Sequence, residues 1–338
     1  MSDIHLSHAP LCKAPDAQPR APDVALPPGA CDCHAHICGP GAAYPYDAAR
    51  IYTPPDATIE SYRHLLAVLG VARAVLIQPS VYGTDNRAML AALRSAGPGF
   101  RGVAVVEPDI PARDVEALHR AGIRGVRLNL VDRREGRNQV PLELVRTLAD
   151  RIAPFGWHIE FLMHVDEFPA LDRILDALPV HVVFGHLGYV RSEKGTAVQG
   201  FQALLRLLRG GRAWVKFTGP YRISSQTLPH SDTNEFAHML LAGGRCWVKL
   251  TGPYRISGAA DLPYDDVDAA ATRLVQAAPG RLIWGSDWPH VMMKKPMPND
   301  GALCDLLARW IPDAATRKRI LVDNPMELYG FGADERIA

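Results

Sequence analysis

The sequence predicts an α/β protein and, within that class, a (β/α)8 TIM barrel. Short apolar runs alternate with amphipathic stretches along most of the 338 residues. Continuous apolar strands separated by helices are typical of a parallel sheet that is covered on both faces. About eight such units favour a closed barrel. The alternative is a doubly wound sheet, but no Gly-x-Gly-x-x-Gly follows the first strand and no Walker-type loop occurs.

The expected elements follow one another in a regular order. Strands are predicted at residues 30–36, 73–79, 101–107, 123–130, 157–164, 181–187 and 281–287, with one more in a Trp-Val-Lys run. Amphipathic helices are predicted between them, for example at residues 58–70, 141–153, 168–177, 201–209 and 267–278. Residues 1–29 are rich in Pro, Ala and polar residues, which predicts a flexible arm before a barrel domain at 30–338.

One segment near the seventh strand occurs twice. Residues 210–224 are repeated at 243–257 with changes only at Cys246 and Leu250. A single repeat is not a solenoid, which needs three or more units. Because a barrel has room for one seventh strand, we expect one copy to lie outside the barrel, pair at an edge or stay unstructured. Continuity with the last strand favours the second copy, whereas spacing from His186 favours the first.

Composition excludes several classes of function. Lys and Arg number 37 and Asp and Glu 36, so neither a nucleic-acid footprint nor a polybasic membrane surface is expected. The chain has neither an apolar run of membrane-spanning length nor the apolar core of a signal peptide. A zinc knuckle at Cys31, Cys33 and Cys38 would need a second ligand pair, and none follows. Reduced thiols and a cytoplasmic location are therefore expected.

Polar residues end several of the predicted strands. His34 and His36 end the first strand, His186 follows the sixth, and Asp287 ends the last in Trp-Gly-Ser-Asp-Trp-Pro-His. In a parallel barrel the strand ends on one face converge on the active site. A carboxylate among aromatic rings there suits general-base work or metal ligation. The alternatives are structural roles: core histidines, and a helix N-cap at Asp287.

His164, at the end of the fifth strand, is open to two interpretations. It could be a third histidine ligand of a metal held also by His34, His36 and Asp287. It could equally be a residue that contacts the ligands without binding the metal itself. Either role requires the end of the fifth strand to lie near the end of the first.

A second group of residues can bind anions. Arg127 ends the fourth strand, Arg133 follows it, and Arg255 or its twin Arg222 follows the duplicated strand. Guanidinium groups bind carboxylates in a bidentate way, so several arginines around one mouth predict a small substrate with more than one negative group. Surface salt bridges are the alternative for each arginine alone. Further candidates at this mouth are Ser80, Tyr46 and His290.

These motifs together resemble the amidohydrolase superfamily, and within it the branch of 2-pyrone-4,6-dicarboxylate hydrolases and 4-sulfomuconolactone hydrolases. The resemblance spans residues 30 to 331. It implies that a water opens a lactone ring, with Asp287 as general base and His34, His36 and His186 polarising the carbonyl. It also implies that the arginines, Ser80 and a loop tyrosine hold the acidic groups.

The resemblance leaves the cofactor open between two alternatives. Members of this branch work without a metal, so no cofactor is expected. A mononuclear Zn²⁺ hydrolase or decarboxylase, with His34, His36, His164 and Asp287 as ligands, is the alternative. The fourth strand has no lysine for a two-metal site. A third hypothesis is an organic-acid-binding barrel that the insertion has inactivated.

Overall fold

The computed structural model of this chain describes residues 9–131, 141–217, 219–227, 230–242, 246–332 and 335. In these residues, nine parallel strands form one continuous sheet. Each strand pairs with the next in sequence order. The ring is nearly closed where Ala35 bridges Trp288, and the His36 amide donates to the Trp288 carbonyl at 2.9 Å. The strands are β1 (Cys31–Ala35), β2 (Arg73–Ile77), β3 (Phe100–Ala104), β4 (Ile123–Asn129), β5 (His158–Leu162), β6 (Val182–Phe184), β7 (Ala213–Phe217), β8 (Cys246–Leu250) and β9 (Leu282–Trp284).

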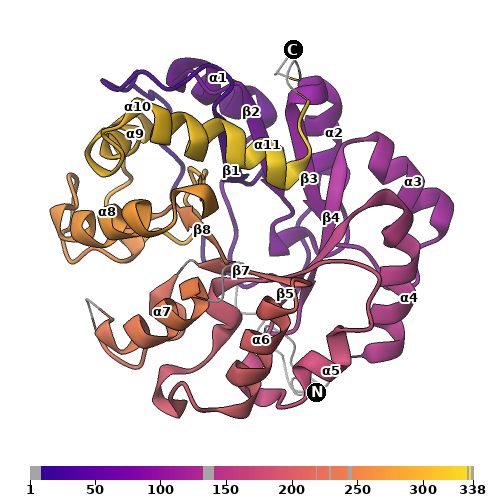
Figure 1. Cartoon of the computed structure of the whole chain (residues 1–338). Coiled ribbons are helices and arrows are strands. Elements are labelled where there is room, and N and C mark those ends of the chain that lie inside the picture. Colours follow the sequence, from indigo (N-terminus) through magenta and orange to yellow (C-terminus); the bar gives the residue numbers. More distant parts are fainter. Residues whose placement is uncertain are drawn as a thin grey trace, which may run out of the picture.

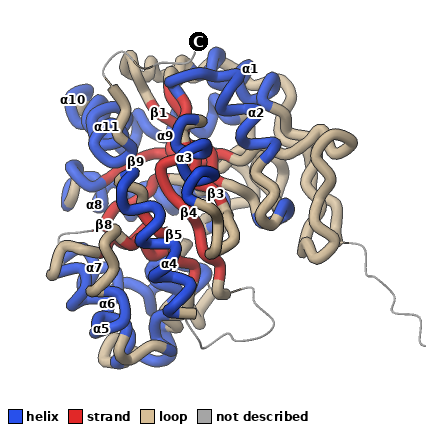
Figure 2. The backbone as a smooth tube through the Cα atoms, turned by 90° about the vertical axis from the view of Figure 1, so that its right-hand side faces the viewer, coloured by secondary structure: helices blue, strands red, loops and turns tan. Residues whose placement is uncertain are grey.

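Helices surround this ring of strands, as Figure 1 shows along the barrel and Figure 2 from the side. The predicted parallel barrel is confirmed, and most predicted helices agree with the structure within a few residues. No helix of the described residues is both long and apolar enough to cross a membrane. The helices are α1 (Ile59–Leu69), α2 (Arg87–Ala96), α3 (Ala112–Arg120), α4 (Leu142–Ile152), α5 (Leu171–Leu175), α6 (Gln199–Arg209), α7 (Asn234–Ala242), α8 (Asp268–Ala277), α9 (Asp300–Trp310), α10 (Ala314–Lys318) and α11 (Asn324–Tyr329).

Helix α1 illustrates why these segments are helical. Its buried residues are Tyr62, Leu65, Leu66 and Leu69, which recur at the spacing of one helical face. The helix ends at Gly70, whose φ of 74° is a left-handed conformation that glycine adopts without strain. The buried face packs on the sheet, and the Tyr62 hydroxyl reaches Asp32 of β1 at 2.8 Å.

The duplicated segment forms two adjacent barrel strands, β7 and β8. Val215 of β7 pairs with Cys246 of β8, and the rings of Trp214 and Trp247 lie 5.7 Å apart. The prediction that one copy lies outside the barrel, at an edge or without structure is therefore wrong. A helix follows each copy, α7 after β7 and α8 after β8. Each copy is thus a complete strand–helix unit, which a parallel sheet can accept beside its twin.

Side chains at alternate strand positions fill the barrel. Val75 and Ile77 of β2 lie in the interior cluster, whereas Ala74 and Leu76, which alternate with them, pack outward against the helices. Phe331 packs beneath Arg73 and Arg101, which stand at the starts of their strands. The C-terminal segment therefore covers the end of the barrel opposite the predicted site.

The described part of the N-terminal segment, residues 9–29, lies against the barrel domain. The amides of Cys12 and Thr53 bond to the carbonyls of Thr53 and Pro10, both at 2.8 Å. The amide of Asp23 donates to Asp305 of α9 at 2.6 Å. Part of the expected arm is thus held by backbone hydrogen bonds.

Candidate active site

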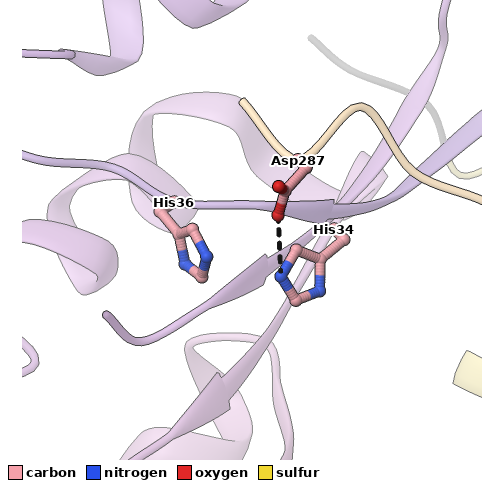
Figure 3. Close-up of side chains that lie close together, drawn as sticks. All are labelled: His34, His36 and Asp287. Atoms are coloured by element: carbon pink, nitrogen blue, oxygen red, sulfur yellow. Dashed lines mark ion pairs between the residues drawn. The ribbon is translucent and has the colours of Figure 1, made fainter. Parts of the chain in front are cut away.

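His34, His36 and Asp287 converge where the first and last strands meet (Figure 3). One possible ligand atom from each lies within 4.8 Å of the others. The Asp287 amide donates to the His34 carbonyl at 2.9 Å, so the closure of the barrel itself holds these residues together. His34 Nε2 stands 3.6 Å from Asp287 Oδ1. The predicted convergence of residues about 250 positions apart is confirmed for these three.

The two carboxylate oxygens of Asp287 have different surroundings. Oδ2 accepts hydrogen bonds from the Tyr254 hydroxyl at 2.9 Å and from Arg255 Nη2 and Nε at 2.9 and 3.1 Å. Burial alone would favour the neutral acid, but the Arg255 charge outweighs it and lowers the pKa of Asp287. Asp287 is therefore an anion at neutral pH, with Oδ1 directed towards His34.

The histidines of the site are neutral at neutral pH. Burial, followed by the Lys249 charge, brings the pKa of His34 well below its usual range. Burial also lowers the pKa of His36 to about 4, and its Nδ1 bonds the Ile77 carbonyl at 2.7 Å. Burial and the Arg222 charge lower the pKa of His186. Neutral imidazoles can each donate through one nitrogen and accept through the other.

A buried aspartate supports the two strand ends from below. Asp32 accepts from the His34 amide at 3.0 Å and from the amide and hydroxyl of Ser286 at 2.9 and 2.5 Å. Its carboxylate thus ties His34 itself and Ser286, the residue before Asp287, to one fixed group. Asp32 stands in the Asp-Cys-His-Ala-His run, but its role depends on the neighbouring last strand.

His186 and His164 lie outside the three-residue cluster. His186 follows β6 with a φ of 46° and makes an edge-on ring contact with Tyr189, centroids 5.2 Å apart. His164 Nδ1 bonds the Tyr189 carbonyl at 2.8 Å. Within the described residues, the four-residue metal set expected from the sequence comes together at three positions, without His164.

A charged layer crosses the barrel interior below the site. Glu160 of β5 pairs with Arg127 of β4 at 2.8 Å and also with Lys216 of β7. Lys249 of β8 donates to the Cys33 carbonyl at 3.0 Å and contacts His34 Nδ1 at 2.9 Å. Burial and the neighbouring Lys216 charge lower the pKa of Lys249 to about 7. Neither lysine is among the site residues predicted from the sequence, although a charged residue inside an apolar strand is itself a signal.

The twin arginines have different partners. Arg255 is partly buried and pairs with Asp287. Arg222 is exposed, packs over the rings of Tyr189 and Tyr221 at 5.9 and 5.4 Å, and forms no ion pair with a carboxylate of the described residues. Arg222 thus stays a candidate for binding an anion of the substrate, whereas Arg255 already pairs with Asp287.

The remaining candidates have different surroundings. Ser80 is exposed, three residues after the end of β2, and Tyr46 is half-buried beside the ring of Tyr82, centroids 5.1 Å apart. His290 is fully buried, with its nitrogens 3.0 Å from the Tyr254 hydroxyl and 3.1 Å from Asp300, so it lies behind Asp287. Arg133 lies outside the described residues.

Known proteins are similar to this chain over nearly its whole length. The amidohydrolase family model matches residues 31–244 and again, overlapping, residues 228–331. The 2-pyrone-4,6-dicarboxylate hydrolase of Comamonas testosteroni is 37% identical over 314 residues, which are 93% of this chain and 94% of that protein. A 4-sulfomuconolactone hydrolase of Rhizobium radiobacter is 33% identical over 323 residues, 95% and 96% of the two chains.

A solved structure has the same fold over nearly the whole chain. It is that of a candidate 2-pyrone-4,6-dicarboxylic acid hydrolase from Pseudomonas putida, with a TM-score of 0.63 and 30% identity. The match covers 91% of this chain and 100% of that one. The second family match begins at residue 228, after the first copy of the repeat and before the second. This chain is a hydrolase that belongs to the amidohydrolase family.

Proposed function

We propose that this protein opens the lactone ring of a small substrate with two or more acidic groups, of the 2-pyrone-4,6-dicarboxylate type. The single observation that carries the proposal is the cluster of Asp287 with His34 and His36, in which Arg255 pairs with Oδ2 and Oδ1 faces His34. Relatives named for lactone hydrolysis, similar over more than nine-tenths of this chain, support the same class of substrate.

The proposed reaction is attack of water on the lactone carbonyl carbon. Asp287 takes a proton from the water through Oδ1, while His34, His36 and His186 orient the water and polarise the carbonyl. The tetrahedral intermediate then collapses, and the bond between the carbonyl carbon and the ring oxygen breaks. The proton held by Asp287 passes to the departing oxygen, so the carboxylate is ready for the next cycle.

The acidic groups of the substrate would be held by the basic residues of the mouth. Arg222 is the strongest candidate because it is exposed and is not paired with a described carboxylate. The Arg127 side chain is 15% exposed, and its charge helps to lower the pKa of both His34 and His186. Arg133, Ser80 and Tyr46 complete the proposed set. Arg255, by contrast, already neutralises Asp287.

A divalent metal is the second candidate, favoured by the cluster of His34, His36 and Asp287. Three ligands with an open position are typical of catalytic zinc, which would lower the pKa of a bound water. The cationic neighbours Lys249 and Arg255, on His34 and Asp287, oppose a further positive charge there. We therefore favour the metal-free reaction.

The decisive experiment is hydrolysis of 2-pyrone-4,6-dicarboxylate by purified protein, followed as loss of ring absorbance with and without a strong chelator. We expect turnover that the chelator leaves unchanged, and metal analysis that shows less than one ion per chain. Turnover lost to chelator and restored by Zn²⁺ would establish the metal-dependent alternative. Lack of turnover on this compound and on sulfo- and carboxymuconolactones would refute the proposal.

We also infer that the protein acts in the cytoplasm. Its six cysteines are free, and five of them are buried. Cys31 and Cys33 point into the barrel interior with their sulfurs 3.8 Å apart. Free thiols at this distance are compatible with a reducing compartment.

A further inference from the structure

We infer that Lys249 is a positioning residue that, together with the Ile77 carbonyl, holds His34 and His36 in opposite tautomers. His34 then presents a hydrogen-bond donor to the substrate, and His36 presents an acceptor. The catalytic consequence rests on the proposed lactone hydrolysis, whereas the tautomers themselves follow from the contacts of the two rings.

The contact of His34 determines its tautomer. Lys249 Nζ lies 2.9 Å from His34 Nδ1 and 3.0 Å from the Cys33 carbonyl oxygen. In its ammonium form Lys249 has three donors and no acceptor, so it donates to His34 Nδ1 as it does to the Cys33 carbonyl. In a neutral imidazole the proton then sits on Nε2. Asp287 Oδ1 is 3.6 Å from Nε2, beyond hydrogen-bond distance, which leaves this N–H available to a substrate oxygen.

The contact of His36 has the reverse effect. Its Nδ1 lies 2.7 Å from the Ile77 carbonyl, which can only accept, so Nδ1 carries the proton. With its single proton on Nδ1, the neutral His36 ring leaves Nε2 as an acceptor. A water that donates one proton to Asp287 Oδ1 can donate the other to His36 Nε2, while His34 Nε2 donates to the carbonyl that is attacked. The two histidines thus have different tasks: His36 binds the attacking water, and His34 binds the carbonyl that the water attacks.

The two tautomers also bear on the metal alternative. A metal needs a lone pair on each histidine nitrogen that binds it, and ligating histidines donate through their other nitrogen. His36 meets this condition because it donates to Ile77. His34 does not, because Lys249 donates to it. Lys249 therefore favours the donor function of His34 over metal ligation.

The duplication provides a matched control for this role. Lys216 stands at the equivalent position of β7, in the same Trp-Val-Lys sequence. Lys216 is partly buried, and Lys249 is buried. It pairs with Glu160 of β5, whereas Lys249 contacts His34 of β1. Loss of either lysine removes a cation from the same layer, but only loss of Lys249 removes the hydrogen bond to His34.

The test is nuclear magnetic resonance of protein labelled with ¹⁵N in its 13 histidines, at pH 6, where a lysine of pKa about 7 is mainly charged. The variants His34→Gln and His36→Gln assign the two rings. We expect Nδ1 of His34 to be unprotonated and Nδ1 of His36 to be protonated. The same protonated nitrogen on both rings, or a doubly protonated His34, would overturn the inference without any lysine variant.

Lysine variants then test the cause and the consequence. In Lys249→Met the His34 ring should lose its single tautomer, and kcat should fall roughly 10- to 100-fold with a smaller change in KM. Lys249→Gln, which keeps an N–H donor, should restore part of both. Lys216→Met should keep the His34 signal of the unaltered protein. An unchanged His34 tautomer in folded Lys249→Met would overturn the role of Lys249.

The two proposals fail in different ways. If no lactone is hydrolysed but the tautomers are as expected and depend on Lys249, the proposed function is wrong and the positioning role stands. If lactone hydrolysis is efficient and His34 keeps its tautomer without Lys249, the positioning role is wrong and the proposed function stands.

Discussion

At the scale of single residues, one carboxylate carries the proposed chemistry because its two oxygens have separate tasks. Oδ2 of Asp287 is occupied by Tyr254 and Arg255, which keep the group ionised and fix its orientation. Oδ1 remains for the water proton. A carboxylate held in this way needs no rotation during the reaction, which is the advantage of a preorganised site.

Replacement of Asp287 by Asn should remove the base while preserving the shape of the side chain. We expect kcat to fall by roughly 10²–10⁴-fold, the usual contribution of a general base. Binding of the substrate, measured by calorimetry on the inactive variant, should change little. Near-normal turnover would exclude Asp287 as the base.

The twin arginines should respond differently to replacement by Ala. Arg222→Ala should mainly raise KM, since a charged contact is worth about 1.5–3 kcal/mol. Arg255→Ala should mainly lower kcat, because Asp287 loses the charge that keeps it ionised and oriented. Steady-state kinetics of both variants provide the comparison, and equal effects of the two changes on KM would contradict this division.

At the scale of elements, the charged layer joins strands that are not all neighbours. Glu160 of β5 pairs with Arg127 of the adjacent β4 and with Lys216 of β7, beyond β6. The Glu160 side chain is 1% exposed. Removing one partner of such a buried pair leaves uncompensated charge, which costs more than the pair contributes.

Glu160→Gln should destabilise the barrel by about 3–5 kcal/mol, measured by urea denaturation at pH 7. Burial opposes ionisation of Glu160, but the charges of Arg127 and Lys216 outweigh it and bring its pKa well below its usual range. Its contribution is therefore fully present above the unfolded pKa of about 4.3 and is lost as pH falls through the lower folded pKa. The difference between the two proteins should shrink in acid. A constant difference from pH 7 to pH 3 would contradict this account.

At the scale of the whole molecule, the duplication has enlarged the barrel by one complete unit. The extra strand pairs on both sides, and α7 follows it as the other helices follow their strands. The hypothesis of an inactivated binding barrel depended on an insertion that blocks the mouth. A strand incorporated into the sheet adds to the wall of the barrel instead, which supports retained catalysis.

Excision of residues 211–243 should give a folded eight-stranded barrel, because the chain rejoins within the repeat and keeps Lys249 and Arg255. We expect cooperative thermal unfolding of this variant. We also expect a higher KM than that of the intact chain, because Arg222 is lost. Lactone hydrolysis by the intact chain at least as fast as by the excised form would end the inactivation hypothesis. Activity that appears only after excision would support it.

The sequence by itself determined the class of fold and the residues at its strand ends. Alternation of apolar strands with amphipathic helices requires a parallel sheet, and the polar ends of β1 and β9 identify His34, His36 and Asp287. These features depend on local pattern and on one topological rule, so they can be read along the chain.

Only the tertiary structure decided the number of strands and the partners of each charge. The repeated sequence does not indicate whether its two copies pair with each other, because strand pairing is a contact between segments that are distant in the chain. For the same reason the identical Trp-Val-Lys sequences could not reveal that Lys249 contacts His34 and Lys216 pairs with Glu160. Those differences arise from the neighbouring strands, which only closure of the barrel brings into contact.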